Sequence, residues 1–283
     1  MKIEFIKYHG AGNDYIALDG RGLDIDWGLL SKNMSQPHFG VFSDGIVVVN
    51  ESNIADIKMR IFNPDGSEAE MSGNGVRLFS KFVLDNKIVQ IGQNSLKVET
   101  GGGVRDVHPV YADGMMISAK VAMGLPKFLR DEIPANKNII FDNSEINDYE
   151  INIAGNFKIN CVNIGNPHAV MITNTDVDDI DLLKIGPLVE NHELFPNRIN
   201  FEIVNILSRN EIKARIFERG AGETLSSGTG TSACGIICIK KGLVGENVKV
   251  NVPGGFLNIS WVKGQEVYLE GPAEKVFSGT WEF

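Results

Sequence analysis

The chain has 283 residues, of which 43% are hydrophobic and 22% are charged, and its formal net charge is −9. This balance is typical of a soluble globular protein of about two domains, and it excludes disordered, collagenous and transmembrane classes. An acidic chain without a long basic run is poorly suited to bind nucleic acid or an anionic membrane. The composition therefore favours a small-molecule partner.

The first ten residues, MKIEFIKYHG, carry charges inside the apolar stretch and show no small-residue cleavage site. We therefore expect no signal peptide. The three cysteines, Cys161, Cys234 and Cys238, are too few and odd in number for a disulfide framework. Both observations predict a protein of the reducing cytoplasm.

A repeat with a shift of 155 residues organises the predicted elements. The segment 58–62, KMRIF, reappears at 213–217 as KARIF. Ten residues after each Phe, a serine opens a glycine-rich turn: Ser72 opens SGNG and Ser227 opens SGTG. Long-period self-similarity of this kind indicates duplicated structural units. The chain is therefore predicted to contain two similar lobes in tandem.

The elements follow the same order in each lobe. The short apolar runs 46–49 and 201–204 predict strands. The apolar periodicity after each serine predicts a helix, and the alternation over 98–125 and 246–270 predicts further strands.

We expect an α+β fold of two pseudo-symmetric lobes, each with a β-sheet wrapped around a largely apolar central helix. The N-terminal lobe is expected to comprise residues 1–120 joined by the C-terminal strand 274–283. The C-terminal lobe is expected to comprise residues 121–273.

The two glycine-rich turns are candidate anion sites. A helix N-terminus exposes unpaired backbone N–H groups and the positive end of the helix dipole, and glycine lets the backbone approach a ligand closely. Two such turns facing each other across a cleft between the lobes would suit a substrate carbon that carries transient negative charge. The alternative is that Ser72 and Ser227 only cap their helices.

Other sites receive weaker support. Gly228-x-Gly230-x-x-Ala233 has the spacing of a dinucleotide fingerprint but does not directly follow a strand, and neither turn continues as a Walker loop. Cys234 and Cys238 lie four residues apart on a predicted helix and could share a metal. No second pair of Cys or His at ligand spacing lies nearby, so we interpret both as buried packing residues and expect no metal.

Long motifs identify a family. They are GAGNDY at 10–15, FNPDGSEAEMSGNGVR at 62–77, NIGNPHAV at 163–170, ERGAGETLSSGTG at 218–230 and GPAEKVFSG at 271–279. Together and in this order they closely resemble diaminopimelate epimerase, over nearly the whole chain. The resemblance implies an isomerase without metal or pyridoxal phosphate. It would invert one α-carbon of diaminopimelate, from LL to meso, to supply lysine and cell-wall precursors.

The resemblance also implies roles for particular residues. In the family, one cysteine removes the α-proton and a second returns a proton from the opposite face, and matching the motifs places these at Ser72 and Ser227. His168 and Glu218 would tune the protonation of this pair. The implied substrate-binding residues are Asn13, Asn63, Gly73, Asn74, Asn166, Asn200, Glu218, Arg219, Gly228 and Thr229. The implied partner is an amino-acid substrate, and a homodimer stays open.

Serine at both catalytic positions leaves three interpretations open. A thiol has a pKa near 8.5 that its surroundings can lower, whereas a serine hydroxyl needs an activating base. Both cysteines of an epimerase have been exchanged in a targeted way, or the chain is a divergent isomerase, or it binds an amino acid without turnover. A divergent isomerase would act on this or another small acid with a different base. The candidates for that base are Glu68, Glu223, His168 and Glu218.

Overall fold

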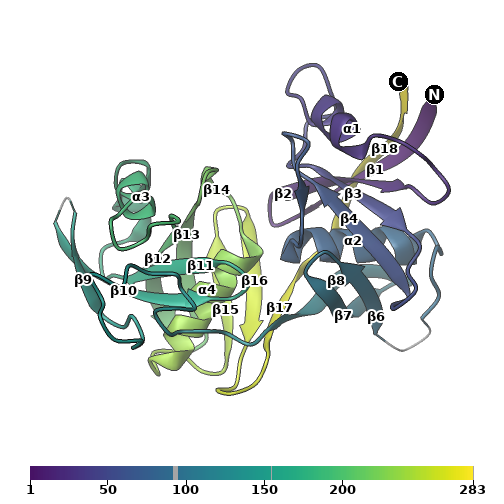
Figure 1. Ribbon diagram of the computed structural model, residues 1–283. Coiled ribbons are helices and arrows are strands. Elements are labelled where there is room, and N and C mark those ends of the chain that lie inside the picture. The colour runs from purple at the N-terminus through teal and green to yellow at the C-terminus, as the bar shows by residue number, and fades with distance from the viewer. Residues whose placement is uncertain (92–94, 154, 283) are drawn as a thin grey trace. The chain divides into compact units, whose positions relative to one another are not determined.

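The structure is a computed structural model that describes residues 1–91, 95–153 and 155–282. Two compact units form: unit 1 comprises Met1–Ala122 with Glu270–Phe283, and unit 2 comprises Met123–Leu269. Phe283, the last residue of the strand expected at 274–283, lies outside the described residues. Each unit is a mixed β-sheet around one buried helix, which confirms the α+β fold (Figure 1).

The elements of unit 1 are β1 (Lys2–Gly10), β2 (Asn13–Asp19), α1 (Trp27–Met34), β3 (Ile46–Asn50), β4 (Ile57–Phe62), β5 (Glu68–Ala69), α2 (Gly73–Asp85), β6 (Leu96–Thr100), β7 (Gly103–Ala112), β8 (Met115–Gly124) and β18 (Glu274–Glu282). In its sheet, β2 pairs in parallel with β3, and β4 in parallel with β6. The neighbours from β18 through β1 to β2, from β3 through β4 to β5 and from β6 to β8 pair antiparallel.

The elements of unit 2 are β9 (Tyr149–Asn152), β10 (Asn156–Asn163), β11 (Pro167–Ile172), η1 (Val177–Asp179), α3 (Leu182–Glu190), β12 (Asn200–Ser208), β13 (Glu211–Glu218), β14 (Gly222–Thr224), α4 (Gly228–Lys240), β15 (Asn247–Val252), β16 (Gly255–Ser260) and β17 (Val267–Pro272). This unit repeats the plan of unit 1, with β11 parallel to β12 and β13 parallel to β15. The chain leaves unit 1 at the end of β8 and returns to it within β17.

The central helices α2 and α4 start in the same way. The hydroxyl oxygens of Ser72 and Ser227 accept hydrogen bonds from the N–H groups of Gly75 and Gly230, at 3.0 and 3.3 Å. Both glycines lie directly on the sheet, since a Cβ at either position would approach an isoleucine side chain to 3.0 Å. The sequence of each turn therefore brings the start of the helix into close contact with the strands beneath it.

Helices α1 and α3 are shorter and also correspond. Asp26 and Asp181 cap them by accepting hydrogen bonds from the backbone N–H groups of Leu29 and Lys184. The two caps are 155 residues apart, which extends the repeat beyond the motifs found in the sequence.

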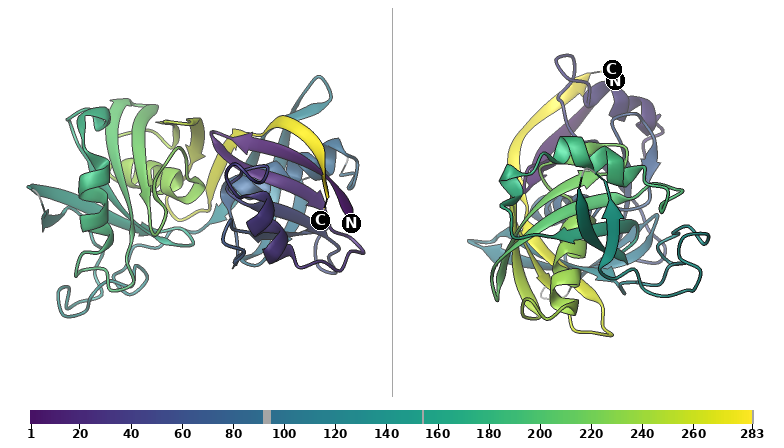
Figure 2. Two further views of the ribbon diagram at one scale, coloured as in Figure 1. Left: turned by 90° about the horizontal axis from the view of Figure 1, so that it is seen from above. Right: turned by 90° about the vertical axis from the view of Figure 1, so that its left-hand side faces the viewer.

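Strands β1 and β18 run side by side in unit 1, so the two ends of the chain lie close together (Figure 2). In the part of the chain that the structure describes, no helix is both long and apolar enough to span a membrane.

Candidate active site

The first half-site surrounds the start of α2 in unit 1. Asn74, which is almost fully buried, donates from Nδ2 to Oδ1 of Asn13 at 3.0 Å. Asn13 in turn donates to the Asp44 carboxylate at 2.6 Å. The Tyr15 hydroxyl lies 3.5 Å from Ser72 Oγ. Polar side chains therefore surround a helix N-terminus whose free N–H groups attract anions.

A buried cation lies in the first turns of α2, next to this half-site. Arg77 is fully buried and donates to the Gly73 carbonyl at 3.1 Å and to Asn74 Oδ1 at 2.5 Å. Both acceptors are neutral. Burial lowers the pKa of Arg77 to about 9, so the guanidinium stays charged at neutral pH. Its charge adds to the positive end of the helix dipole and favours a bound anion.

The second half-site surrounds the start of α4 in unit 2. The Ser227 hydroxyl donates to Oε2 of Glu218 at 2.9 Å, and the Thr224 hydroxyl donates to Oε1 of the same carboxylate at 2.9 Å. Thr229 Oγ1 lies 3.5 Å from Ser227 Oγ. Ser227 therefore has a carboxylate base within hydrogen-bond distance, which a serine needs for proton transfer.

A buried pair orients His168 in the same half-site. His168 Nδ1 lies 2.6 Å from Glu202 Oε1, and both side chains are fully buried. Its Nε2 lies 2.8 Å from Asn166 Oδ1. Burial raises the pKa of Glu202, and the attraction of His168 opposes that rise. The carboxylate holds the imidazole in one orientation between two oxygen atoms.

Asn200 and Arg219 are joined through the backbone. Asn200 donates to the Pro167 carbonyl at 2.8 Å and accepts from the Arg219 N–H at 2.9 Å. The Arg219 guanidinium donates to the Asn197 carbonyl at 3.0 Å. The parallel pairing of β11 with β12 places His168 opposite Asn200, so strands β11 to β13 gather these residues.

Three residues named in the sequence analysis have other partners. Asn63 donates to Ser67 Oγ at 2.9 Å in the turn before β5. Glu68 pairs with Arg60, and Glu223 pairs with Arg215. Both glutamates thus belong to salt bridges on β4–β5 and β13–β14.

Sequence reasoning missed three residues of the half-sites. Tyr15 matches His168 at the shift of 153 that also relates Asn13 to Asn166, so the repeat carried a signal for it. Glu202 is a carboxylate inside an apolar strand, at the position that Val47 takes in the first lobe. Arg77 stands in a motif that was noticed, but its burial is visible only in the fold.

The described residues contain no group of three or more His, Cys, Asp and Glu side chains that could hold a metal ion. Cys234 and Cys238 are buried and unpaired, as is Cys161. The burial of Cys234 and Cys238 agrees with the interpretation of the helical pair as packing residues.

We expect the three cysteines of the folded chain to resist thiol reagents. Burial raises the pKa of each thiol, to about 12 for Cys238, so the reactive thiolate forms only in strongly alkaline solution. A disulfide reagent at pH 8 should modify less than about 0.1 equivalent of native protein and all three thiols after denaturation. Rapid modification of the native chain at pH 8 would contradict this burial.

Solved structures show which class of protein has this fold. A phenazine biosynthesis protein of the PhzF family from Bacillus anthracis superposes with a TM-score of 0.72, at 18% identity over 100% of both chains. A probable proline racemase from Agrobacterium radiobacter gives a TM-score of 0.69, at 15% identity over 98% of this chain and 92% of the other. The chain has the two-unit fold of these proteins.

The sequence comparisons are more specific. The family model described as Diaminopimelate epimerase matches residues 5–129 and 160–276. A protein named diaminopimelate epimerase from Methanococcus maripaludis is 41% identical over 280 residues, which cover 98% of this chain and 99% of that protein. The chain belongs to the diaminopimelate epimerase family, a family of isomerases, and the resemblance seen in the sequence is confirmed.

Proposed function

We propose that this chain is a cofactor-independent epimerase that inverts one α-carbon of diaminopimelate. The observation that carries the proposal is the matched pair of helix starts, each opened by a serine, with Glu218 bonded to Ser227 at 2.9 Å. In this proposal the two half-sites act on opposite faces of one carbon. The proposed location is the cytoplasm.

Removal of the α-proton leaves negative charge that spreads into the neighbouring carboxylate. The backbone N–H groups of Gly73, Asn74, Gly228 and Thr229 lie in the first turns of α2 and α4 and would bind this carboxylate. Arg77 adds a buried positive charge behind the first of these turns. Within each unit these groups are held by the start of the helix, so in this proposal they stabilise the developing charge without rearrangement of that helix start.

The proton transfers follow from the different partners of the two serines. On one face, the α-carbon–hydrogen bond breaks as Ser227 Oγ takes the proton, and Ser227 passes its own hydroxyl proton to Glu218. On the other face, Ser72 gives its hydroxyl proton to the carbanion, and the Tyr15 hydroxyl is placed to hydrogen-bond the resulting alkoxide. After the product leaves, Ser72 takes a proton from water and Glu218 releases its proton to water, which restores the starting state. Because serine is a weaker acid than cysteine, we expect turnover to be slow.

A second candidate function is binding of a zwitterionic amino acid without turnover. Ser72 favours it, because its side-chain hydrogen bonds within the described residues join it to the Gly75 N–H and the Tyr15 hydroxyl. Neither bond is to a carboxylate, whereas Ser227 is bonded to Glu218. The two candidates differ in whether the α-proton exchanges with solvent.

Solvent exchange tests the proposal directly. LL-diaminopimelate is incubated with the protein in deuterium oxide, and nuclear magnetic resonance follows the α-proton and the appearance of the meso isomer. Loss of the α-proton signal with formation of the meso isomer supports the epimerase. Binding by calorimetry without exchange, for the chain and for the Ser72→Cys, Ser227→Cys double variant alike, would favour the binding protein. If only other amino acids exchange their α-proton, the substrate is one of those amino acids and not diaminopimelate.

Glu218 provides a matched test of the proton relay. We expect Glu218→Gln to lower the exchange rate by at least about 100-fold, because glutamine can accept the hydrogen bond of Ser227 but cannot take its proton. Glu211→Gln, at the half-buried start of the same strand, is the control and should exchange at the wild-type rate. Equal rates for the two variants would exclude Glu218 as the base.

A further inference from the structure

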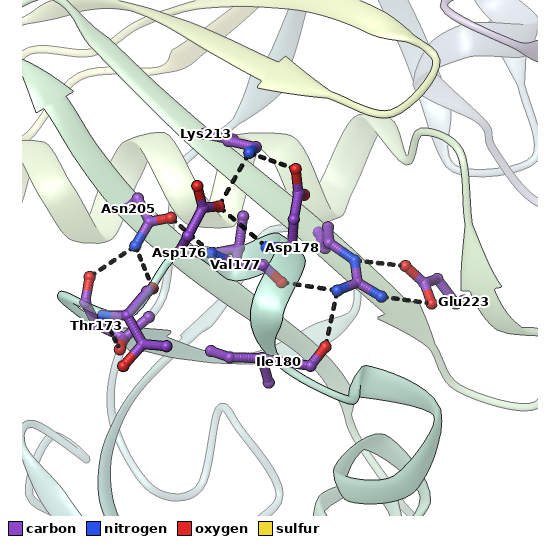
Figure 3. Close-up of polar contacts among 10 residues, drawn as sticks. Thr173, Asp176, Val177, Asp178, Ile180, Asn205, Lys213 and Glu223 are labelled. Atoms are coloured by element: carbon purple, nitrogen blue, oxygen red, sulfur yellow. Dashed lines mark hydrogen bonds and ion pairs between the residues drawn. The ribbon is translucent and has the colours of Figure 1, made fainter.

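Side chains of unit 2 hold one of its loops through hydrogen bonds to the main chain of that loop. It runs from the end of β11 to the cap of α3 and contains η1 (Figure 3). Asn205 Nδ2 donates to the carbonyls of Thr173 and Thr175, at 2.9 and 2.7 Å. Asn205 Oδ1 accepts from the Val177 N–H at 2.7 Å. One asparagine side chain thus binds three backbone groups of the loop.

Two cations on β13 complete the contacts of this loop (Figure 3). Arg215 Nη1 donates to the carbonyls of Val177 and Ile180, at 2.7 and 2.8 Å, while its other nitrogens bind Glu223. Lys213 forms ion pairs with the loop carboxylates of Asp176 and Asp178. We call the residues that hold the loop the unit 2 cradle: Asn205, Lys213, Arg215 and Glu223.

Unit 1 contains the same four residue types at a shift of 155: Asn50, Lys58, Arg60 and Glu68. We call them the unit 1 cradle. The strand registers are the same, since Asn50 lies opposite Lys58 as Asn205 lies opposite Lys213. Arg60 also binds Glu68 through two hydrogen bonds of 2.8 Å, as Arg215 binds Glu223.

The corresponding loop of unit 1 does not reach this cradle. It has residues 20–25 between β2 and the helix cap, where unit 2 has residues 173–180, so it is two residues shorter. Both loops begin alike, with the N–H of Gly20 bonded to the Val49 carbonyl and that of Thr173 bonded to the Val204 carbonyl. In unit 1, however, the Leu23 N–H then turns back to the Gly20 carbonyl at 3.2 Å.

A cavity of about 730 Å³ lies over the unit 1 cradle. It is lined by all four cradle residues and by Arg21, Glu51 and Glu99, among others. Asn50 Oδ1 is buried and has no hydrogen-bond partner among the described residues. Its counterpart, Asn205 Oδ1, accepts a backbone N–H. A buried amide oxygen without a partner costs free energy that a donor from a ligand would recover.

The guanidinium of Arg60 also has a nitrogen that forms no hydrogen bond with the described residues. Its hydrogen bonds in the described part of the chain use Nε and Nη2, both to Glu68, whereas Arg215 Nη1 binds two carbonyls. Lys58 differs, because Glu99 pairs with it at 2.8 Å where unit 2 has Asn251 opposite Lys213. The main-chain contacts are therefore available in unit 1, while the acidic contacts are already made within the unit.

We propose that the unit 1 cradle binds an uncharged peptide turn of a partner protein through its main chain. A backbone N–H of the turn donates to Asn50 Oδ1, and two carbonyls accept from Arg60 Nη1. Carboxylates on the turn are not required, because Lys58 is neutralised and Glu51 and Glu68 also line the cavity. The loop held in unit 2 is the template for the bound backbone.

Two synthetic peptides with blocked ends serve as probes. One has the sequence of residues 173–181, TNTDVDDID, and the other, the neutral peptide, has Asn in place of all four aspartates, Asp176, Asp178, Asp179 and Asp181. The full chain is labelled with nitrogen-15, and the side-chain amide signals of Asn50 are followed during titration. We expect both peptides to bind saturably, and the neutral peptide to bind at least as tightly as the acidic one.

Variants locate the binding. Asn50→Leu and Arg60→Met should each weaken binding of the neutral peptide at least tenfold. Arg21→Ala is the matched control, because Arg21 lines the cavity but pairs with Asp19 and has no counterpart in the unit 2 contacts, and it should change affinity less than twofold. Epimerase activity should be unchanged in all three variants.

Three outcomes would overturn the proposal. The first is that the Asn50 signals do not saturate at millimolar peptide. The second is that Asn50→Leu leaves the affinity for the peptide unchanged. The third is that Asn50→Leu changes the sedimentation of the free protein. The last result would mean that a second copy of this chain occupies the cavity. A melting temperature for Asn50→Leu within 2 °C of the unaltered chain ensures that lost binding reflects the contact and not unfolding.

Discussion

Changing Ser72 and Ser227 together to cysteine should raise the rate of α-proton exchange by about 10² to 10⁴-fold, the range that general acid–base catalysis contributes. A thiol at a helix N-terminus has a pKa that the helix dipole lowers toward neutrality, so it can both remove and return a proton. Serine at the same place meets this requirement only with a base beside it, as at Ser227. The measurement is deuterium incorporation at the α-carbon of diaminopimelate.

The single variants separate the two faces of the reaction. Ser227→Cys should become less dependent on Glu218, because its thiol can ionise without passing a proton to the carboxylate. The thiol introduced at position 72, where the serine is half-buried, should react with a disulfide reagent at pH 8, against the inert background of the buried native cysteines. A folded double variant with less than a tenfold gain in exchange would contradict the assignment of these positions.

The second large effect concerns stability. Asn205→Leu should lower the free energy of unfolding of unit 2 by about 3 kcal/mol, since it removes three hydrogen bonds worth about 1 kcal/mol each. Asn50→Leu, the matched change in unit 1, should cost less than about 0.5 kcal/mol, because Asn50 Oδ1 has no partner to lose among the described residues. Urea unfolding compares the two variants.

Hydrogen exchange checks the cause of this difference. In Asn205→Leu the amide of Val177 should lose protection first, because its acceptor is gone. In Asn50→Leu the amide protection of unit 1 should stay as it is in the unaltered chain. Equal destabilisation by the two variants would show that the contacts of the loop contribute little to the stability of unit 2.

The sequence predicted the parts of the fold that local chemistry determines. Helices α2 and α4 were predicted from Ser72 and Ser227, because each serine is followed by glycines and an apolar helical pattern. Both helices are present. Helices α1 and α3 were not predicted. They have eight and nine residues, and α3 contains Pro187, so neither carries enough periodicity to stand out. Tertiary packing and the aspartate caps determine them instead.

The candidate site also contains some residues that the sequence indicates and others that only the fold reveals. Residues inside long motifs, such as Asn13 and Glu218, could be named as candidates from the sequence. Glu202 could not, because its importance comes from the parallel pairing of β11 with β12, which brings it to His168 across 34 residues of chain. The choice among possible bases also needed the fold, which pairs Glu223 with Arg215 and leaves Glu218 at Ser227.

The pairing of β18 with β1 has a consequence for biosynthesis. Unit 2 is continuous in the chain, whereas unit 1 lacks an edge strand until residues 274–282 have been made. At about 5 to 20 residues per second, translation of residues 123–269 takes roughly 7 to 30 s. During that interval the chain is still attached to the ribosome, and the outer edge of β1 is unpaired. Unit 2 can thus mature first, against the usual order in which the amino-terminal part of a nascent chain folds ahead of the rest.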